Sequence, residues 1–366
     1  MANIEEQIKE IEDELAKTQY NKNTQHHIGK LKAKMARLKD DLEVRRSKGP
    51  KTAGYAVRKS GHATVALVGF PSVGKSTLLN KITNAQSEVA AYQFTTLTVV
   101  PGLMEYRGAK IQVLDLPGLI KDASKGKGRG REVLSVVRSA DLVILMIDVF
   151  ETNIQVLVDE LKTANLRLNQ RPPDIVIAKK NRGGISVNFT TKQSTLDEDL
   201  VTEMMNEYGH INADIVIRED IVEDQLIDYI SGNRLFIPAI AVINKVDLVN
   251  QAYLKQIQKR LKGWKIVPIA AEKGQGLEQL REELYNALRF INIYMKPQGK
   301  EADMVEPLVI KDGSDVGMIC DSIHRDFRKN FRYALIWGKS ARFPGQIVGL
   351  DHKVKDEDIV TIIVKR

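Results

Sequence analysis

The sequence predicts an α/β protein whose central part is a doubly wound parallel sheet interrupted by an inserted small α+β domain. From Thr64 onward, near-continuous apolar runs alternate with helical patterns, which is typical of parallel strands covered on both faces. The runs that end near Asp148 and begin near Ile237 lie about 90 residues apart. One crossover helix with its loops needs only about 20 to 30 residues. We therefore expect an insertion over residues 171–236.

The central domain is expected in two parts, residues 61–170 and 237–291. Its strands are expected in the runs TVALVG, IQVLDLPG, LVILMIDV, IPAIAVINKVD and KIVPIAA. Its helices are expected at Ser76 to Thr83, Gly130 to Ser139, Asn153 to Leu168, Ala252 to Leu261 and Leu277 to Phe290. These elements alternate along the chain, as a doubly wound fold requires.

Residues 1–60 are expected to form an N-terminal helical hairpin followed by a basic linker. Apolar residues recur at helical spacing on both sides of a polar break, at Ile4, Ile8, Ile11 and Leu15 and then at Ile28, Leu31, Met35, Leu38 and Leu42. Between Lys30 and Lys59 we count 11 basic residues against three acidic ones. This run is either a solvated face or a contact with nucleic-acid phosphates.

The insertion and the C-terminal residues each predict a small domain of their own. Within residues 171–236 we expect strands at DIVIAKK, GISVNFT and ADIVIRE and helices at Leu196 to Tyr208 and Val222 to Ser231. The turn KKNRGG in this insertion is basic, and it is either a solvated turn or an RNA contact. Residues 292–366 predict a compact unit of several strands and one helix, long enough to fold alone.

Composition and charge exclude several classes of protein. The chain has 366 residues, a formal net charge of +8 and a single cysteine, Cys320, so it can form no internal disulfide and no cysteine-based zinc site. It contains no run of about 18 uncharged apolar residues, and its start has no signal-peptide layout. We expect a cytoplasmic protein that does not enter a membrane.

The stretch GFPSVGKST predicts a phosphate-binding loop, because it matches G-x-x-x-x-G-K-[ST] between an expected strand and an expected helix. Gly69 and Gly74 would let the backbone amides and the helix N-terminus face the phosphates. Lys75 would reach the β- and γ-phosphates, and the Ser76 hydroxyl would bind Mg²⁺. The expected nucleotide-binding residues here are Gly69, Phe70, Pro71, Ser72, Val73, Gly74, Lys75, Ser76 and Thr77.

The stretch DLPG, one strand after the phosphate loop, predicts the second part of the phosphate site. The Asp115 carboxylate can approach Mg²⁺ there, and the Gly118 N–H can face the γ-phosphate. Leu116, Pro117 and Leu119 complete this expected stretch. Upstream, Thr96 in YQFTTLTVVPG, in preference to Thr95, is expected to join the Mg²⁺ shell when the γ-phosphate is present and to leave it after hydrolysis. The alternative for TTLTVV is an ordinary strand.

The stretch NKVD, which follows an expected strand, predicts that the base is guanine. Guanine offers two adjacent donors, the N1–H and the exocyclic amine, which the Asp247 carboxylate can accept together, whereas adenine presents an acceptor on that edge. Asn244 is expected to order the loops, Lys245 to lie against the base, and Val246 to complete the motif. In IAAEKGQG, the backbone near Ala270 and Ala271 could meet the guanine oxygen, although related loops often carry serine there.

These motifs, in this order, resemble the Obg-like branch of the translation-factor-related GTPases. With SEVAAYQFTTLTVVPG, GKGRGRE and the terminal YALIWGKSARFPGQIVGLDHKVKDEDIVTIIVK, the chain resembles the developmentally regulated GTP-binding proteins (DRG) over essentially its whole length. The resemblance implies a P-loop GTPase domain with a ribosomal-protein-like insertion and a C-terminal β-grasp (TGS) domain. It also implies association with the ribosome or its rRNA or tRNA, and in eukaryotes a stabilising protein partner.

The residue after the glycine of DLPG is unusual for a GTPase. Many relatives carry a glutamine there that orients the attacking water, and the Leu119 side chain cannot hydrogen-bond water. The resemblance implies that another group, a bound cation or a partner positions the water. Some related GTPases use K⁺ held by an asparagine in the phosphate loop; Ser72 at that place leaves potassium open. Lys75, Thr96 and Gly118 are the expected catalytic residues.

Three functions remain open on the sequence alone. The first is a Mg²⁺-dependent GTPase that acts as a ribosome- or RNA-associated switch. The second is another P-loop enzyme, an ATPase or a small-molecule kinase, against which Asp247 argues. The third is an RNA-binding assembly module that uses GTP as a structural ligand. The segment KGKGRGR beside DLPG is a solvated loop, an RNA contact or a support for the nucleotide.

Overall fold

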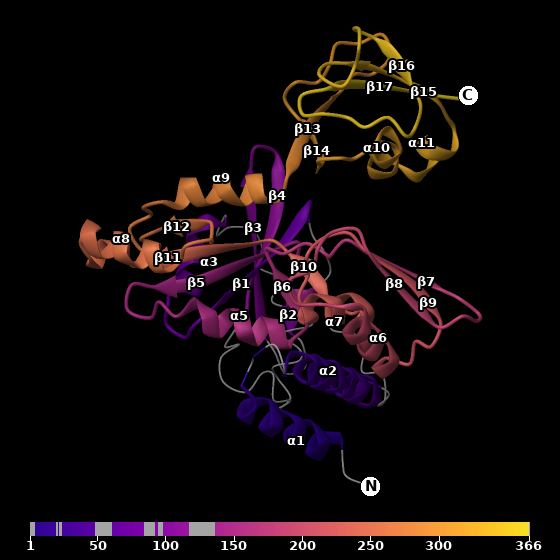
Figure 1. Cartoon of the computed structure of the whole chain (residues 1–366). Helices are drawn as coiled ribbons and strands as arrows, with labels where there is room; N and C mark the ends of the chain where they lie inside the picture. The colour runs from indigo at the N-terminus through magenta and orange to yellow at the C-terminus, as the bar shows by residue number, and fades with distance from the viewer. Residues whose placement is uncertain are drawn as a thin grey trace. The chain divides into compact units, whose positions relative to one another are not determined.

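The computed structural model describes residues 4–19, 21, 24–47, 61–83, 92–93, 98–116 and 136–365. The chain divides into two compact units. The insertion unit comprises Met1–Gly54 with Asn165–Phe236, and the main unit comprises Tyr55–Ala164 with Ile237–Arg366. Figure 1 labels the helices and strands of both units. Among the described helices, none is both long and apolar enough to cross a membrane.

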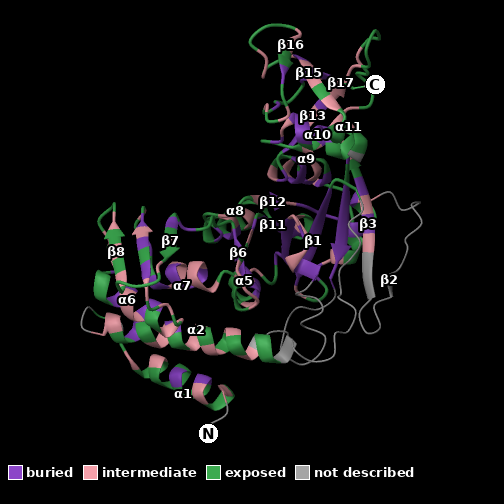
Figure 2. Ribbon diagram, turned by 90° about the vertical axis from the view of Figure 1, so that its right-hand side faces the viewer, coloured by how far each residue is buried: buried purple, intermediate pink, exposed green. Residues whose placement is uncertain are grey.

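The main unit contains the predicted doubly wound sheet, in the strand order β12-β11-β5-β1-β4-β3-β2. Its five parallel strands are β1 (Ala63–Gly69), β4 (Ala109–Asp115), β5 (Leu142–Asp148), β11 (Ala239–Asn244) and β12 (Ile266–Pro268). Every residue of β1, β5 and β11 is buried, as Figure 2 shows in purple for β1. The predicted fold class is confirmed, because strands buried on both faces need no alternation of polar residues.

One edge of this sheet is antiparallel, which the sequence prediction did not include. Strand β3 (Thr98–Tyr106) pairs antiparallel with β4, and β2 (Tyr92–Gln93) pairs antiparallel with β3. A two-residue turn at Arg107 and Gly108 joins β3 to β4, with φ angles of 47° and 80°. Two successive positive φ angles make the tight turn that suits a hairpin rather than a crossover. The sheet is therefore mixed rather than wholly parallel.

The helices of the main unit follow the prediction, with corrections at two ends. They are α3 (Lys75–Ile82), α5 (Ile154–Thr163), α8 (Gln251–Arg260), α9 (Leu277–Ala287) and the short 3₁₀ helix η1 (Val246–Leu248). The helix expected up to Leu168 ends at Thr163, because Asn165 adopts a φ of 66° that reverses the chain. Leu166–Leu168 instead forms β6, which pairs with β10 (Leu235–Ile237).

The second correction concerns the helix expected up to Phe290, since α9 ends at Ala287. Arg289 has a φ of 53°, and Phe290 begins the first strand of the C-terminal part. Most of the helix expected at Gly130 to Ser139 lies outside the described residues.

The insertion unit combines the N-terminal helical hairpin with the inserted segment. The hairpin helices are α1 (Ile4–Lys17) and α2 (Gln25–Ser47), and the inserted elements are β7 (Ile175–Lys179), β8 (Ile185–Phe189), α6 (Glu198–Glu207), β9 (Ala213–Ile217) and α7 (Glu223–Ser231). The sheet order is β7-β9-β8. Ala33 of α2 lies in one buried cluster with Leu200 and Ile215. Helix α2 therefore completes the core of the insertion, although the two segments lie more than 100 residues apart in the sequence.

The C-terminal part of the main unit is a five-stranded sheet covered by helix α10. Its elements are β13 (Phe290–Met295), β14 (Leu308–Lys311), α10 (Val316–Ile323), α11 (Arg325–Lys329), β15 (Phe331–Trp337), β16 (Gln346–Val348) and β17 (Ile359–Val364), in the sheet order β14-β13-β17-β15-β16. Ile319 and Cys320 pack on Ala334, Ile336 and Val360. Cys320 is fully buried, and burial raises the pKa of its thiol. It is a core residue.

The one helix expected in this part is two helices. His324 lies between α10 and α11 and has an extended backbone, with a φ of −165°. Its Nδ1 accepts from the Asp326 N–H. The extended backbone at His324 ends the first helix and starts the second.

A buried network of charged side chains ties the insertion unit together. The Asp228 carboxylate of α7 accepts from Arg167 of β6 at both oxygens and from Arg234 Nε at 3.0 Å. Arg234 Nη1 also donates to Asp40 Oδ1 of α2 at 3.2 Å. The side chains of Arg167, Asp228 and Arg234 are each less than 10% exposed. This network connects the hairpin, helix α7 and the β6–β10 pair at which the insertion begins and ends.

We expect Asp228→Asn to lower the free energy of unfolding of the insertion unit by about 3 to 5 kcal/mol. The substitution removes the carboxylate charge that two buried guanidinium groups share, and breaking a buried pair costs about that much. Urea denaturation of the full chain measures the change, with proteolysis within the insertion unit used to detect its unfolding. Glu12→Gln removes the exposed pair with Lys39 and serves as the control, with an expected cost below about 1 kcal/mol. Equal effects of the two substitutions would contradict a structural role for the buried network.

Candidate nucleotide site

The loop between β1 and α3 is built so that two of its positions accept only glycine. A Cβ at Gly69 would lie 2.3 Å from the Met146 carbonyl oxygen, and a Cβ at Gly74 would lie 2.5 Å from Asn244 Nδ2. Gly74 also has a φ of 94°, in the left-handed region that glycine favours. The two glycines are therefore required by packing within the protein, in addition to the predicted approach of phosphates.

Lys75 at the start of α3 lies across the loop that precedes it. Its Nζ donates to the carbonyl oxygens of Gly69 at 3.0 Å and Phe70 at 2.9 Å. Burial lowers the pKa of Lys75, and the nearby Asp115 carboxylate opposes this effect. The side chain is thus held over the phosphate loop, next to the position where the prediction places the β- and γ-phosphates.

Ser76 and Asp115 form a pair of oxygen ligands at the carboxyl edge of the sheet. Ser76 Oγ donates to Asp115 Oδ2 at 2.7 Å, and Asp115 is 8% exposed at the end of β4. Asp115 Oδ1 is buried and has no hydrogen-bond partner among the described residues. A buried carboxylate oxygen without a partner is costly, and hard oxygen donors are what Mg²⁺ prefers. The two residues therefore fit a magnesium ion.

Asn244 joins the phosphate loop to the loop after β12. Its Nδ2 donates to the Val73 carbonyl oxygen at 2.8 Å, and its Oδ1 accepts from the Ala271 N–H at 3.0 Å. The side chain is buried, with 4% of its surface exposed. Parallel strands end at the same edge of a sheet, so β1, β11 and β12 bring these three loops together. The ordering role predicted for Asn244 corresponds to these two bonds.

Lys245 is fixed by a residue that the sequence reasoning missed. Lys245 has a φ of 63°, and its Nζ donates to the Ser72 carbonyl oxygen at 3.0 Å and to Asp148 Oδ2 at 2.6 Å. Asp148 Oδ1 accepts from the N–H groups of Phe150 and Glu151, each at 2.9 Å. Burial alone would raise the pKa of Asp148, but these donors lower it below its usual value. The available signal was an acid ending the run LVILMID, as Asp115 ends IQVLD.

Asp247, the predicted guanine-reading residue, lies in η1 with its carboxylate ionised. Asp247 Oδ2 lies 2.9 Å from Lys273 Nζ, and the hydrogen bond from Lys273 lowers the carboxyl pKa. The Val246 N–H donates to the Ile269 carbonyl oxygen at 3.2 Å, which holds the motif against β12. An ionised carboxylate is acceptor-only, as the two donors of guanine require.

The backbone near Ala270 and Ala271 is engaged within the protein. The Ala270 N–H donates to the Gln275 carbonyl oxygen at 3.0 Å, and the Ala271 N–H donates to Asn244. Both alanines are buried, and Gly276, with a φ of 76°, closes the loop before α9. The predicted contact of this backbone with the guanine oxygen stays a prediction.

Some of the remaining predicted site residues lie within the described residues, and others lie outside them. Val73 and Leu116 are buried, Phe70 is partly buried, and Pro71 and Thr77 are exposed in the phosphate loop and at the start of α3. Thr96, Pro117, Gly118 and Leu119, with the segment KGKGRGR, lie outside the described residues.

Three family matches cover the chain from residue 64 to residue 364. Residues 64–180 match a family described as 50S ribosome-binding GTPase, and residues 182–290 match the C-terminal region of that domain. Residues 291–364 match the TGS domain. The C-terminal sheet is therefore the predicted TGS domain.

Curated relatives match over nearly the full length of both chains. A GTP-binding protein of Methanocaldococcus jannaschii is 55% identical over 366 residues, covering 99% of this chain and 93% of its own. Developmentally-regulated G-protein 3 of Arabidopsis thaliana is 44% identical over 371 residues, covering 100% of each chain. Developmentally-regulated GTP-binding protein 2 of Homo sapiens is 42% identical over 365 residues, covering 99% of this chain and 100% of its own.

The chain belongs to the developmentally regulated GTP-binding protein family. It is a GTP-binding P-loop GTPase, and the sequence-based assignment to this family is confirmed. The second open reading, an ATPase or kinase, is thereby set aside.

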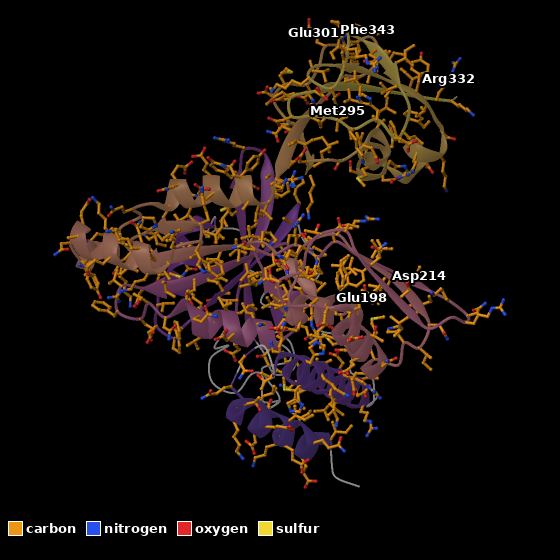
Figure 3. The ribbon with its side chains drawn as sticks, in the orientation of Figure 1. Glu198, Asp214, Met295, Glu301, Arg332 and Phe343 are labelled. Atoms are coloured by element: carbon orange, nitrogen blue, oxygen red, sulfur yellow. The ribbon has the colours of Figure 1, made fainter. Side chains whose placement is uncertain are left out.

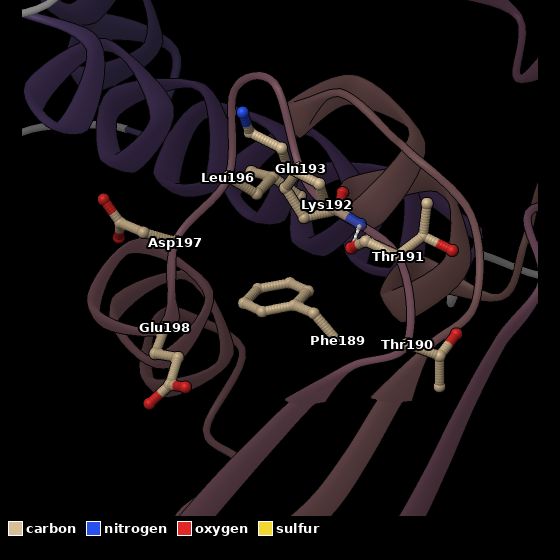
Figure 4. Close-up of a pocket in the computed structure, with 8 residues that line it drawn as sticks. All are labelled: Phe189, Thr190, Thr191, Lys192, Gln193, Leu196, Asp197 and Glu198. Atoms are coloured by element: carbon tan, nitrogen blue, oxygen red, sulfur yellow. Dashed lines mark hydrogen bonds between the residues drawn. The ribbon is translucent and has the colours of Figure 1, made fainter.

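The DRG insertion unit contains a separate shallow hollow of about 440 Å³ (Figure 4). Phe189 lies at its centre, and Lys192, Asp197 and Glu198 are among the residues around it. Asp197 Oδ1 accepts from the Leu200 N–H as the cap of α6, and Oδ2 lies 2.6 Å from His26 Nε2. The Asp197 side chain thus serves the packing of α6 and the hairpin, and none of the motif residues lines the hollow.

We expect Asn244→Ala to weaken GDP binding by this GTPase about 10- to 100-fold. The substitution removes the two bonds that hold the phosphate loop to the loop after β12, so part of the binding energy is spent on ordering them, and the expected loss corresponds to about 1.4 to 2.8 kcal/mol. Isothermal titration with GDP measures the change. Asn250→Ala is the control, because Asn250 caps α8 through the Tyr253 N–H and touches no motif residue. Unchanged affinity in Asn244→Ala would contradict the idea that this side chain orders the site.

Proposed function

We propose that this DRG protein is a Mg²⁺-dependent enzyme that hydrolyses GTP to GDP and phosphate and acts as a ribosome- or RNA-associated switch in translation. The observation that carries the chemical part is the Asp115 carboxylate, with one oxygen bonded to Ser76 Oγ and the other buried without a partner among the described residues. The match to a 50S ribosome-binding GTPase family and the TGS domain support the translational part.

Ser76, Asp115 and Lys75 would act on the phosphates. Magnesium, when bound, neutralises charge on the β- and γ-phosphates. Ser76 Oγ and the Asp115 carboxylate would hold this ion. Lys75 would exchange its bonds to the Gly69 and Phe70 carbonyls for bonds to phosphate oxygens. Its pKa is lowered by burial, and the phosphates would favour the charged amine.

Asp247 and Lys245 would hold the base. The Asp247 carboxylate would accept from guanine N1–H and from the exocyclic amine, in exchange for its bond to Lys273. The Lys245 stem would lie against the ring, because its amine is already fixed on Ser72 O and Asp148. Guanine would thus be read by the Asp247 carboxylate, which follows two residues whose side chains are already bonded to neighbouring loops before the nucleotide arrives.

Thr96, Gly118 and Leu119 would set the rate. Thr96 would complete the metal shell in the GTP state, and the Gly118 N–H would face the γ-phosphate. Leu119 has no group that can orient the attacking water, so the free protein would hydrolyse GTP slowly. The ribosome or RNA would then supply or position the missing group. Potassium remains a candidate for the same role, although Ser72 replaces the asparagine that holds it elsewhere.

We expect Ser76→Ala to remove most of the Mg²⁺ dependence of GTP binding. In the wild type, affinity for a fluorescent GTP analogue should be higher in Mg²⁺ than in EDTA. In Ser76→Ala this ratio should fall about 10-fold or more, because one oxygen ligand is lost and Asp115 loses its partner. Ser139→Ala is the control, since its hydroxyl bonds only the Val136 carbonyl in the described structure. If the ratio of affinities in Mg²⁺ and in EDTA were unchanged in Ser76→Ala, the result would contradict the proposed metal site.

We expect single-turnover GTP hydrolysis by the purified protein to be slow and to rise at least 10-fold with ribosomes. The reason is that Leu119 cannot orient water, so the docked partner lowers the barrier. Phosphate release from radiolabelled GTP, with and without ribosomes, measures both rates. Fast hydrolysis that ribosomes do not change would contradict the proposal. No phosphate release under any condition would favour the alternative, an RNA-binding assembly module that keeps GTP as a structural ligand.

A further inference from the structure

Two loops form a tip at one end of the three-stranded sheet in the insertion unit. We define this basic tip as residues 179–184, which join β7 to β8, and residues 209–214, which lead from α6 into β9. The strand register places both Lys179 and Ile185 opposite Ala213. The two loops therefore meet at the same end of the sheet, where Figure 1 shows the β7, β8 and β9 strands side by side.

The tip is held in one conformation by bonds between its two loops. The Lys180 N–H donates to the Asn212 carbonyl oxygen at 3.1 Å, and the Ala213 N–H donates to the Gly184 carbonyl oxygen at 3.2 Å. The Asn212 side chain adds a third bond, because its Oδ1 accepts from the Gly184 N–H at 2.8 Å. A ligand that binds here would not have to order the backbone first, which favours affinity.

The two glycines of the tip have no side chains that cover the outer side of its turn. Gly183 and Gly184 have φ angles of 105° and 72°, and a Cβ at either would meet nothing within 4 Å. Here the surrounding space does not demand glycine, unlike at Gly69 and Gly74. The turn needs the left-handed backbone, and its outer side is open for another molecule to approach closely.

The charge of the tip is positive and only partly balanced. Lys180 Nζ lies 2.6 Å from Asp214 Oδ1, the one acidic residue in either loop, and Figure 3 labels this aspartate on β9. Lys179 and Arg182 are exposed and have no ion pair in the described part of the chain. Lys179 adds to burial in lowering the pKa of His210, so its charge acts on the neighbouring loop. Two cations on a fixed turn are therefore available to an anionic partner.

The composition of the tip indicates which anion it would bind. Residues 179–184 and 209–214 contain no phenylalanine, tyrosine or tryptophan, so the tip lacks the large aromatic rings on which single-stranded bases stack. Ile211 is 72% exposed but is a single apolar side chain, which does not make a protein-docking patch. Lysine and arginine side chains contact phosphates without reading bases, and a turn made of glycines lets a phosphate approach closely.

We propose that the basic tip is an RNA phosphate-binding site, in which Lys179 and Arg182 contact successive backbone phosphates and the Gly183–Gly184 turn permits close approach. The inference rests on the proposed association with the ribosome or RNA and adds where the insertion unit contacts it. Such binding is independent of base sequence and sensitive to salt. It is also independent of GTP hydrolysis, because no tip residue is a nucleotide-site residue.

The test is binding of the full-length, GDP-loaded chain to a fluorescent RNA hairpin over a range of salt concentrations. Lys179→Gln with Arg182→Gln should weaken binding about 10-fold at 0.1 M salt. The slope of log affinity against log salt should fall by about 1.4 to 1.8, because each lost phosphate contact contributes about 0.7 to 0.9. The matched control is Lys192→Gln with Arg218→Gln, which removes the same charge after the far ends of β8 and β9. This control should bind like the wild type.

Several outcomes would overturn the tip assignment. These are an unchanged salt slope in the tip variant, an equal loss in the control variant, or equally tight binding of a polyglutamate probe, which would indicate an acidic protein partner. Ribosome cosedimentation of the wild type separates this inference from the proposed function. If the wild type and the tip variant cosediment with ribosomes equally and bind hairpin RNA equally, the RNA-site proposal is wrong. The proposed ribosome-associated switch then stands. If the wild type binds neither ribosomes nor RNA, both fail.

Discussion

The nucleotide site depends on the Asn244 side chain, which bonds the phosphate loop at Val73 O and the base-reading side at the Ala271 N–H. Gly74 has no Cβ because Asn244 Nδ2 occupies that space. Lys245 repeats the connection through Ser72 O and the ionised Asp148. Phosphate and base loops are therefore one body in this structure, and a nucleotide would lose little further entropy by ordering them.

The catalytic side of the site is less complete than the base side. The Ser76–Asp115 pair leaves one buried carboxylate oxygen without a partner in the described chain, and Lys75 bonds carbonyls of its own loop. In the proposed mechanism a cation and phosphates would replace these internal bonds. Leu119 adds no polar group at all. The proposed dependence of the hydrolysis rate on a partner rests on Leu119, because the described residues of the site include no replacement for the water-orienting glutamine.

Most of the fold was predictable because each element has its own pattern, whereas the misses arise where one residue changes the chain direction. The buried parallel strands and the inserted segment followed from apolar runs and from the interval between Asp148 and Ile237. The end of α5 depends on the positive φ of Asn165, which helical periodicity does not reveal. Asp148 was missed because its role is a tertiary contact with Lys245. The packing requirement for glycine at Gly69 and Gly74 was also missed, because only the structure shows that a Cβ there would collide with Met146 and Asn244.

The basic tip of the insertion unit carries only a modest charge, which could still contribute to RNA binding. Two unpaired cations at the basic tip would give only weak, salt-sensitive attraction by themselves. A second weak contact from the same chain becomes intramolecular once the first has formed, and effective concentrations in the millimolar range then multiply the two affinities. The bonds that Asn212 makes to Lys180 and Gly184 hold the two loops of the tip together, so its geometry is set before a partner binds. RNA binding by the tip and nucleotide binding by the main unit can thus be altered separately, because they use different residues on different units.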